Sequence, residues 1–283
     1  MTEDFRPRLR ILCEVFAYCI RTAAAIGVRE RHWKRKETGM RRFIGAVMLA
    51  AAFVAVSNGP VRAESADEIK KQIHAKVSKL KTISYKMKSV SETTDPNLST
   101  KSTTEGTLEY MRKGDKILSR MEMTSKSIMV MGGNETKTDS KMIIVDDGEF
   151  IYNYSEAADS KHVIKQKRDQ SNSEAVFNPE KGFKDTEKMY AYKALPDETV
   201  DGKPCWTLEM TPTDPSLAYI GKSVTCYDKA TGMVLKSTTY DPKGKVTTSM
   251  TITDLKVDAD IPAERFKFTP PPGVEVHDAS KGG

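Results

Sequence analysis

The sequence has few of the residues, and none of the local motifs, by which enzyme active sites are usually recognised. It contains no HExxH zinc motif, no GxSxG nucleophile turn and no glycine-rich phosphate loop. Three of its four histidines follow residue 63, and His74, His162 and His277 lie on separate predicted elements without a carboxylate or cysteine at metal-ligand spacing. Acidic pairs such as Asp146-Asp147 are typical of turns. We therefore expect no catalytic residue, no metal site and no cofactor.

Long apolar runs are equally scarce. One run, residues 43–56, follows two arginines and precedes a polar stretch that ends in small residues. This order is typical of a secretory signal peptide, and the run is short for a transmembrane helix. The sequence therefore predicts a signal peptide over residues 40–63, with cleavage between Ala63 and Glu64. A retained membrane anchor is the alternative.

Residues 1–39 carry mixed charge and no clear period, and Met40 offers a second start. We interpret them as a non-native upstream extension, with an unusually long leader as the alternative, and residues 64–283 as a single domain. Residues 1–63 hold 12 of the 45 basic and 5 of the 39 acidic residues, so cleavage leaves 33 and 34. The exported part is then nearly neutral, which removes the main support for nucleic-acid binding.

Cysteine is rare, and two of the four cysteines fall within the predicted leader. Cys205 and Cys226 remain, on either side of what looks like a loop between two strands. A symmetric hairpin centred beside Pro215 and Ser216 would place them opposite each other. Because exported proteins meet an oxidising environment, we predict a structural disulfide between them.

The mature part begins with one helical pattern and continues with strand patterns. Ile69, Ile73, Val77 and Leu80 recur at helical spacing after Ser65, a suitable N-cap. The period then changes to two, which predicts strands in these segments: "TISYKMKSV", "GTLEYMR", "KILSRMEM", "KMIIV", "EFIYNY", "KHVIKQK", "AYKALP", "CWTLEM", "KSVTCYD", "MVLKSTTY" and "KVTTSMTITDLKV".

The connections between these strands are short. Asp147-Gly148 predicts a tight turn, and a short helix is expected between Ser173 and Tyr190, with Pro179 in its first turn. Residues 89–104 and 132–141 are rich in Ser, Thr and Lys, and are interpreted as loops or as exposed strand ends. Hairpin-length connections without βαβ spacing favour a mainly β (α+β) fold with one curved antiparallel sheet or barrel.

Methionine is the abundant residue, with 11 of 14 after residue 63. Several share a strand face, as Met121 does with Met123 and Ile117. Unbranched thioether side chains adapt to irregular apolar partners. Filling of an ordinary core is the alternative, but few helices are available to cover an apolar sheet face, which leaves room for a lipid cavity. Its expected lining is Leu108, Tyr110, Ile117, Met121, Met123, Ile144, Phe150, Tyr152, Trp206, Leu208, Met210, Met250 and Ile252.

The chain closes on "FKFTPPPGVEV", residues 266–276. Phe266 and Phe268 alternate as in a short strand that points toward the apolar face. The prolines remove backbone donors and fix an extended path out of the sheet. Gly273 then permits a turn into a last short strand, residues 274–276.

The order of these elements resembles the periplasmic lipoprotein carrier LolA and its wider superfamily. The resemblance rests on five segments in sequence: "EGTLEYMRKGDKI" (105–117), "IIVDDGEFIYNY" (143–154), "VDGKPCWTLEMTP" (200–212), "CYDKATGMVLKSTTYDPKGK" (226–245) and "IPAERFKFTPPPGVEV" (261–276). The mature chain is longer than the usual carrier, and its cysteine pair is not part of the carrier's general pattern.

The resemblance implies a half-open antiparallel β-barrel whose concave apolar face is covered by an N-terminal helix and a second short helix. It implies a periplasmic, non-enzymatic, monomeric carrier that shields lipoprotein acyl chains between an inner-membrane release complex and an outer-membrane acceptor. A sensor of the RseB type, signalling to a membrane partner, is the alternative. Arg112, six residues after Gly106, matches the family's arginine that ties the helical lid to the barrel.

Overall fold

The computed structural model describes residues 64–281 apart from 96–97, 159 and 169–173. The predicted leader, including Ala63, lies outside the described residues. None of the described helices is long and apolar enough to cross a membrane.

A twelve-stranded sheet forms the body of the described chain, in the order β12-β6-β5-β4-β3-β2-β1-β11-β10-β9-β8-β7. Neighbours pair antiparallel except β12 and β6, which are parallel, and the terminal strands β12 and β7 are not paired with each other. The strands are β1 Thr82–Asp95, β2 Leu98–Lys113, β3 Lys116–Met131, β4 Asn134–Asp146, β5 Phe150–Ala157, β6 Ser160–Lys167, β7 Tyr190–Val200, β8 Lys203–Pro212, β9 Lys222–Asp228, β10 Val234–Tyr240, β11 Val246–Val257 and β12 Val276–Asp278. The expected mainly β, unclosed architecture is confirmed.

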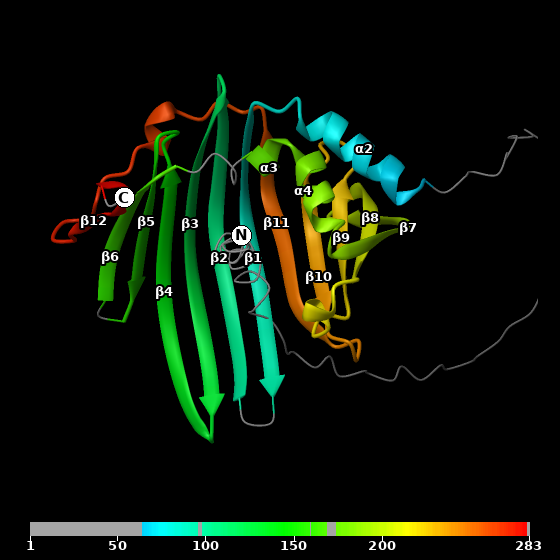
Figure 1. Ribbon diagram of the computed structural model, residues 1–283, viewed down its shortest axis with the longest axis horizontal. Helices are drawn as coiled ribbons and strands as arrows, with labels where there is room; N and C mark the ends of the chain where they lie inside the picture. Colours follow the sequence, from blue (N-terminus) through cyan, green and yellow to red (C-terminus); the bar gives the residue numbers. More distant parts are fainter. Residues whose placement is uncertain (1–63, 96–97, 159, 169–173, 282–283) are drawn as a thin grey trace, which may run out of the picture. The chain divides into compact units, whose positions relative to one another are not determined.

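The two Ser/Thr/Lys-rich segments are strand ends and not loops. Residues 89–95 and 98–104 form the far ends of β1 and β2, which stay in register from Thr82 opposite Met111 to Asp95 opposite Leu98. Residues 132–141 belong to the turn after β3 and to β4. Strands β1 to β4 therefore extend well beyond the helices (Figure 1).

Three helices cover one end of the sheet: α2 Ala66–Val77, α3 Glu174–Phe177 and α4 Pro179–Thr186. Helix α2 starts as predicted at Ser65, whose side chain accepts a hydrogen bond from Glu68 N, while the Glu68 side chain accepts one from Ser65 N at 2.7 Å. The expected second helix is two short helices, of which α4 carries Pro179 in its first turn. All three helices lie over strands at the β7 to β11 side (Figure 1).

The strand register assigns each side chain to one of two faces. Met87, Gly106, Met123 and Met142 stand opposite one another on β1 to β4, so they share a face. The helices pack on this face, because Phe177 of α3 contacts the β1 residue Ile83. We call it the inner face and the opposite side the outer face.

The end of the chain crosses the outer face, contrary to the predicted strand. Phe266 ends a 3₁₀ helix, η2 Ala263–Phe266, and is buried against Leu118 and Ile261. Phe268 stacks on Tyr152 with ring centroids 5.2 Å apart. The prediction placed both rings toward the wrong face because the outer face also has buried apolar residues here. The predicted turn at Gly273 is confirmed by its φ of 76°, but the last strand is Val276–Asp278.

The predicted disulfide is wrong. Cys205 and Cys226 are free and buried, because Cys205 lies opposite Asp228 and Cys226 opposite Thr207. The register of β8 against β9 is thus shifted by two residues from the predicted register, in which the two cysteines faced each other. The prediction assumed a symmetric turn, whereas the connecting loop contains one turn of 3₁₀ helix, η1 Pro215–Leu217.

Both thiols should be unreactive in the folded protein. Burial raises the pKa of Cys226 to about 11, with a further contribution from Glu198, and burial also raises the pKa of Cys205. Since the thiolate is the reactive form, we expect a thiol reagent at pH 8 to label neither residue at a measurable rate until the protein unfolds. Labelling of residues 64–283 in denaturant without reductant should then count two thiols. A count near zero would contradict the free cysteines.

Gly106 is required by packing, and its replacement should destabilise the sheet. A Cβ at this position would lie 2.4 Å from the backbone oxygen of Glu122 and 2.7 Å from Met123 Cγ. We expect Gly106→Ala to lower the free energy of unfolding by about 1–3 kcal/mol. Gly182→Ala, in α4 with no atom within 4 Å of its Cβ, is the matched control and should raise stability by about 0.5–1 kcal/mol. Denaturant unfolding measures both, and equal changes would contradict this account.

Candidate functional site

The inner face is apolar where the helices cover it. Ile69 and Ile73 of α2 and Phe183 of α4 form one buried cluster with Trp206 and Leu208 of β8. In a second cluster, Phe177 of α3 is buried with Leu80, Ile83 and Ile117. These contacts arise because the apolar stripe of an amphipathic helix faces the alternating apolar positions of the strands. The helices therefore form a lid on the sheet.

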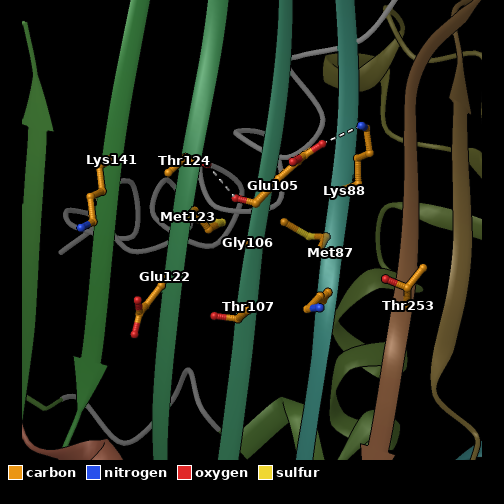
Figure 2. Close-up of a pocket in the computed structure, with 11 residues that line it drawn as sticks. Met87, Lys88, Glu105, Gly106, Thr107, Glu122, Met123, Thr124, Lys141 and Thr253 are labelled. Atoms are coloured by element: carbon orange, nitrogen blue, oxygen red, sulfur yellow. Dashed lines mark hydrogen bonds and ion pairs between the residues drawn. The ribbon is translucent and has the colours of Figure 1, made fainter.

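Beyond the lid, the inner face continues as a group of methionines. We call Met87, Met121, Met123, Met142 and Met250 the methionine band; they pack around Leu108 with Tyr85 and Tyr110. Figure 2 shows Met87 and Met123 reaching toward each other from β1 and β3 across Gly106. Gly106 has no side chain, so two thioethers from strands that are not neighbours can share the space above it.

Next along the strands, the inner face carries hydroxyl groups. Ser125 Oγ lies 3.1 Å from Ser102 Oγ and 3.0 Å from Thr104 Oγ1. Similar cross-strand pairs join Ser223 to Thr239 at 3.0 Å and Thr225 to Ser237 at 2.9 Å. The inner positions of β2 from Leu98 to Tyr110 are without exception uncharged.

Arg112 is the next inner position of β2, and it contacts the lid. Its Nη2 donates to the carbonyl of Ser78, the C-cap of α2, at 3.3 Å. The guanidinium carbon lies 4.9 Å from the centroid of the Phe177 ring in α3. Although its side chain is exposed, Arg112 joins the sheet to two of the three lid helices.

Further polar contacts join α2 and the segment before it to the end of α4 and to strands β7 and β8. The ammonium group of Lys70 in α2 hydrogen-bonds the carboxylate of Glu187, which follows α4, and lies 4.9 Å from the centroid of the Tyr192 ring. Burial alone would lower the pKa of Lys70, but hydrogen bonds to Asp67 and Glu187 raise it above its usual value. Trp206 Nε1 donates to the Glu64 carboxylate at 2.8 Å, which ties the segment just before the α2 N-cap to the sheet.

A hollow of about 480 Å³ lies behind the methionine band and is lined mainly by outer-face residues (Figure 2). Its lining includes two ion pairs, Lys88 Nζ with Glu105 Oε1 at 2.6 Å and Lys86 Nζ with Asp254 Oδ2 at 2.7 Å. Such a polar lining does not suit an apolar ligand. The inner face is therefore the candidate site.

The register places eleven of the thirteen expected lining residues on the inner face: Leu108, Tyr110, Ile117, Met121, Met123, Ile144, Trp206, Leu208, Met210, Met250 and Ile252. Phe150 and Tyr152 lie instead on the outer face, since Tyr152 is opposite Val145 and stacks on Phe268. Their alternation was correctly recognised, but alternation alone does not tell which face of a strand the helices cover.

Sequence reasoning missed several residues of this site. Met87 and Met142 belong to the methionine band, and Phe177 carries the lid contact of Arg112. The two methionines could have been found from the strand alternation, since each lies in a predicted strand. Phe177 could not, because it reaches Arg112 from a helix about 65 residues later in the chain.

Comparison with known proteins gives distant similarities. A family model described only as an uncharacterized protein matches residues 123–263. A search of curated proteins gave no significant match. Among solved structures, MucB in the MucA/MucB complex of Pseudomonas aeruginosa is 16% identical, with a TM-score of 0.42, over 71% of this chain and 61% of MucB. The chain thus spans less than two thirds of MucB.

Two further structures are similar over nearly their whole length. An uncharacterized conserved protein from Thermus thermophilus is 10% identical, with a TM-score of 0.43, over 75% of this chain and 98% of its own. A LolA superfamily protein from Nitrosomonas europaea is 13% identical, with a TM-score of 0.27, over 73% of this chain and 99% of its own.

Proposed function

We propose that this protein is an exported, periplasmic carrier that holds the acyl chains of lipoproteins, or of related lipids, against the inner face of its sheet. The observation that carries the proposal is the inner face itself. Along β2 it is uncharged from Leu98 to Tyr110, and it ends at Arg112, which contacts the lid. The sequence resemblance to the LolA superfamily supports the same function.

Such a carrier needs no catalytic group. Burial of one CH₂ group is worth about 0.8 kcal/mol, so a chain of about 16 carbons gains on the order of 10 kcal/mol before the ordering of chain and lid is subtracted. The remainder is enough for reversible binding. Transfer then requires only an acceptor that binds the acyl chains more tightly.

The methionine band suits a site that must open. Met87, Leu108 and Met123 are 6%, 4% and 5% exposed, so bound chains must displace side chains that now pack together. Thioether side chains rearrange at low cost and accept irregular apolar partners. Binding would then shift the protein toward a state with the lid moved away, and Arg112 would act as a latch that resists this change.

The test is mass spectrometry of what copurifies with the exported protein from its native envelope. Triacylated lipoproteins would support the carrier and, by the family resemblance, partners at the inner-membrane release complex and outer-membrane acceptor. Free phospholipid or glycolipid would keep the inner-face site and change the cargo. Cargo that is never transferred to acceptor membranes, together with a captured signalling protein, would favour the sensor. An empty protein that also fails to bind a fluorescent fatty acid would overturn the proposal.

A further inference from the structure

Exposed apolar side chains gather at the end of one hairpin. Ile128, Met129 and Met131, the last part of β3, are 36%, 38% and 60% exposed. We call residues 128–131, with the turn formed by Gly132 and Gly133, the hairpin tip. Figure 1 shows this tip at the end of the sheet remote from α2, α3 and α4. Apolar side chains grouped at a projecting end commonly mark a contact surface.

The backbone of the hairpin tip is already paired. Met131 stands opposite Asn134, so the connection is a two-residue turn, and Gly132 and Gly133 have φ values of 57° and 83°. Positive φ at both positions is the geometry that lets a two-residue turn follow the twist of its strands. Because β3 hydrogen-bonds both β2 and β4 up to the turn, the backbone that carries the exposed apolar side chains can enter an apolar medium already paired, whereas β4 pairs with β5 only from Ser140 on.

The apolar side chains of the tip leave both faces of the hairpin. By the register, Ile128 lies opposite Lys101 and Lys137 on the outer face, while Met129 and Met131 belong to the inner face. A groove on a protein partner would cover one face and leave the other in water. A lipid surface surrounds both faces, so it accounts for all the exposed apolar residues of the tip together.

The charges behind the tip fit the same partner. Lys101, Lys126 and Lys137 of β2 to β4 stand against Glu92 of β1 and against Glu135 and Asp139 of β4, which is three cations against three carboxylates. Lys137 pairs with Glu135 at 3.0 Å. Long lysine side chains near an inserted apolar segment can reach the headgroup layer. Because these charges balance, apolar contact, and not attraction to anionic lipid, must supply the affinity.

The inner face of β3 connects the tip to the lid. Its inner positions are Met131, Met129, Ser127, Ser125, Met123, Met121, Ser119 and Ile117, and none is charged. We propose that the hairpin tip docks on a lipid bilayer surface and that acyl chains reach the methionine band along β3 from this end. The docking stands on the exposed tip, whereas the route for acyl chains rests on the proposed carrier function.

The experiment is flotation of the exported protein with protein-free vesicles of phosphatidylethanolamine and phosphatidylglycerol, three to one. We compare it with the triple variant Ile128→Thr, Met129→Thr, Met131→Thr, which keeps strand propensity and removes the apolar surface. The vesicle-bound fraction should fall at least about tenfold. The matched variant Ile128→Leu, Met129→Leu, Met131→Leu should bind like the parent. Unfolding midpoints show whether the hairpin is intact in each.

Two results would overturn the docking: a parent protein that does not float with vesicles, or a threonine variant that floats equally well. Binding only to envelope membranes that contain protein would also overturn it and indicate a protein partner. A fluorescent fatty acid in solution separates the two proposals. If the parent floats with vesicles but binds no fatty acid, the docking is supported and the carrier is not. If the threonine variant binds fatty acid normally but loads it from vesicles at least tenfold more slowly, both are supported.

Discussion

Replacing Arg112 with leucine should slow the release of a bound fluorescent fatty acid by about tenfold. The change removes the hydrogen bond to Ser78 O and the contact between the guanidinium and the Phe177 ring. For an exposed side chain these contribute about 1 kcal/mol and about 0.5 kcal/mol. Loss of their sum favours the lid-open state, which holds the acyl chain, by about a factor of ten, and most of such a change in affinity appears in the release rate. Stopped-flow fluorescence with excess unlabelled acceptor vesicles measures the rate.

Two further variants separate the latch from general effects of charge. Arg112→Lys keeps the positive charge but loses the planar group that stacks on Phe177, so its release rate should be intermediate. Lys113→Leu removes the next cation of β2, whose side chain alternates to the outer face away from the lid, and should leave the rate unchanged. Because the same two contacts are absent from the unfolded chain, the replacement should lower the free energy of unfolding by at most about 1.5 kcal/mol and leave the protein folded. A release rate equal to that of the parent would refute the latch.

The fold could be predicted largely because its signals are local. Ser65 with Glu68 specifies the start of α2, and Asp147-Gly148 specifies the turn between β4 and β5. Strand alternation identified most of the inner face for the same reason, since a strand repeats every two residues. Each of these features depends on residues close to one another in the sequence.

What could not be predicted depends on contacts between distant segments. The thiols were mispaired because the register of β8 and β9 depends on how their loop folds, and the sequence does not show that η1 forms there. Phe266 and Phe150 were assigned to the inner face because the sequence does not reveal that the end of the chain crosses the outer face. The contact between Arg112 and Phe177 was not foreseen, because Phe177 lies on a helix about 65 residues later in the chain.

Loss of a buried ion pair on the β4 to β6 side of the sheet should lower the stability of the protein more than the other substitutions. Arg168 Nε donates to Asp146 Oδ2 at 2.8 Å, and the two side chains are 8% and 5% exposed. The other oxygen, Oδ1, accepts a hydrogen bond from Gly148 N at 2.8 Å, so one carboxylate joins the β4–β5 turn to the residue after β6. The predicted role of Asp146 as a turn residue is thus confirmed, with an added partner.

Arg168→Leu should lower the free energy of unfolding by about 3–5 kcal/mol, because it leaves the Asp146 carboxylate buried without its cation. Adding Asp146→Asn to this variant removes the uncompensated charge while keeping an oxygen for Gly148 N, so the double variant should regain part of the loss, about 1–2 kcal/mol. Denaturant unfolding of the two single variants and the double variant gives the coupling between the sites. Additive losses would contradict it, and would mean that the pair contributes through packing and not through charge.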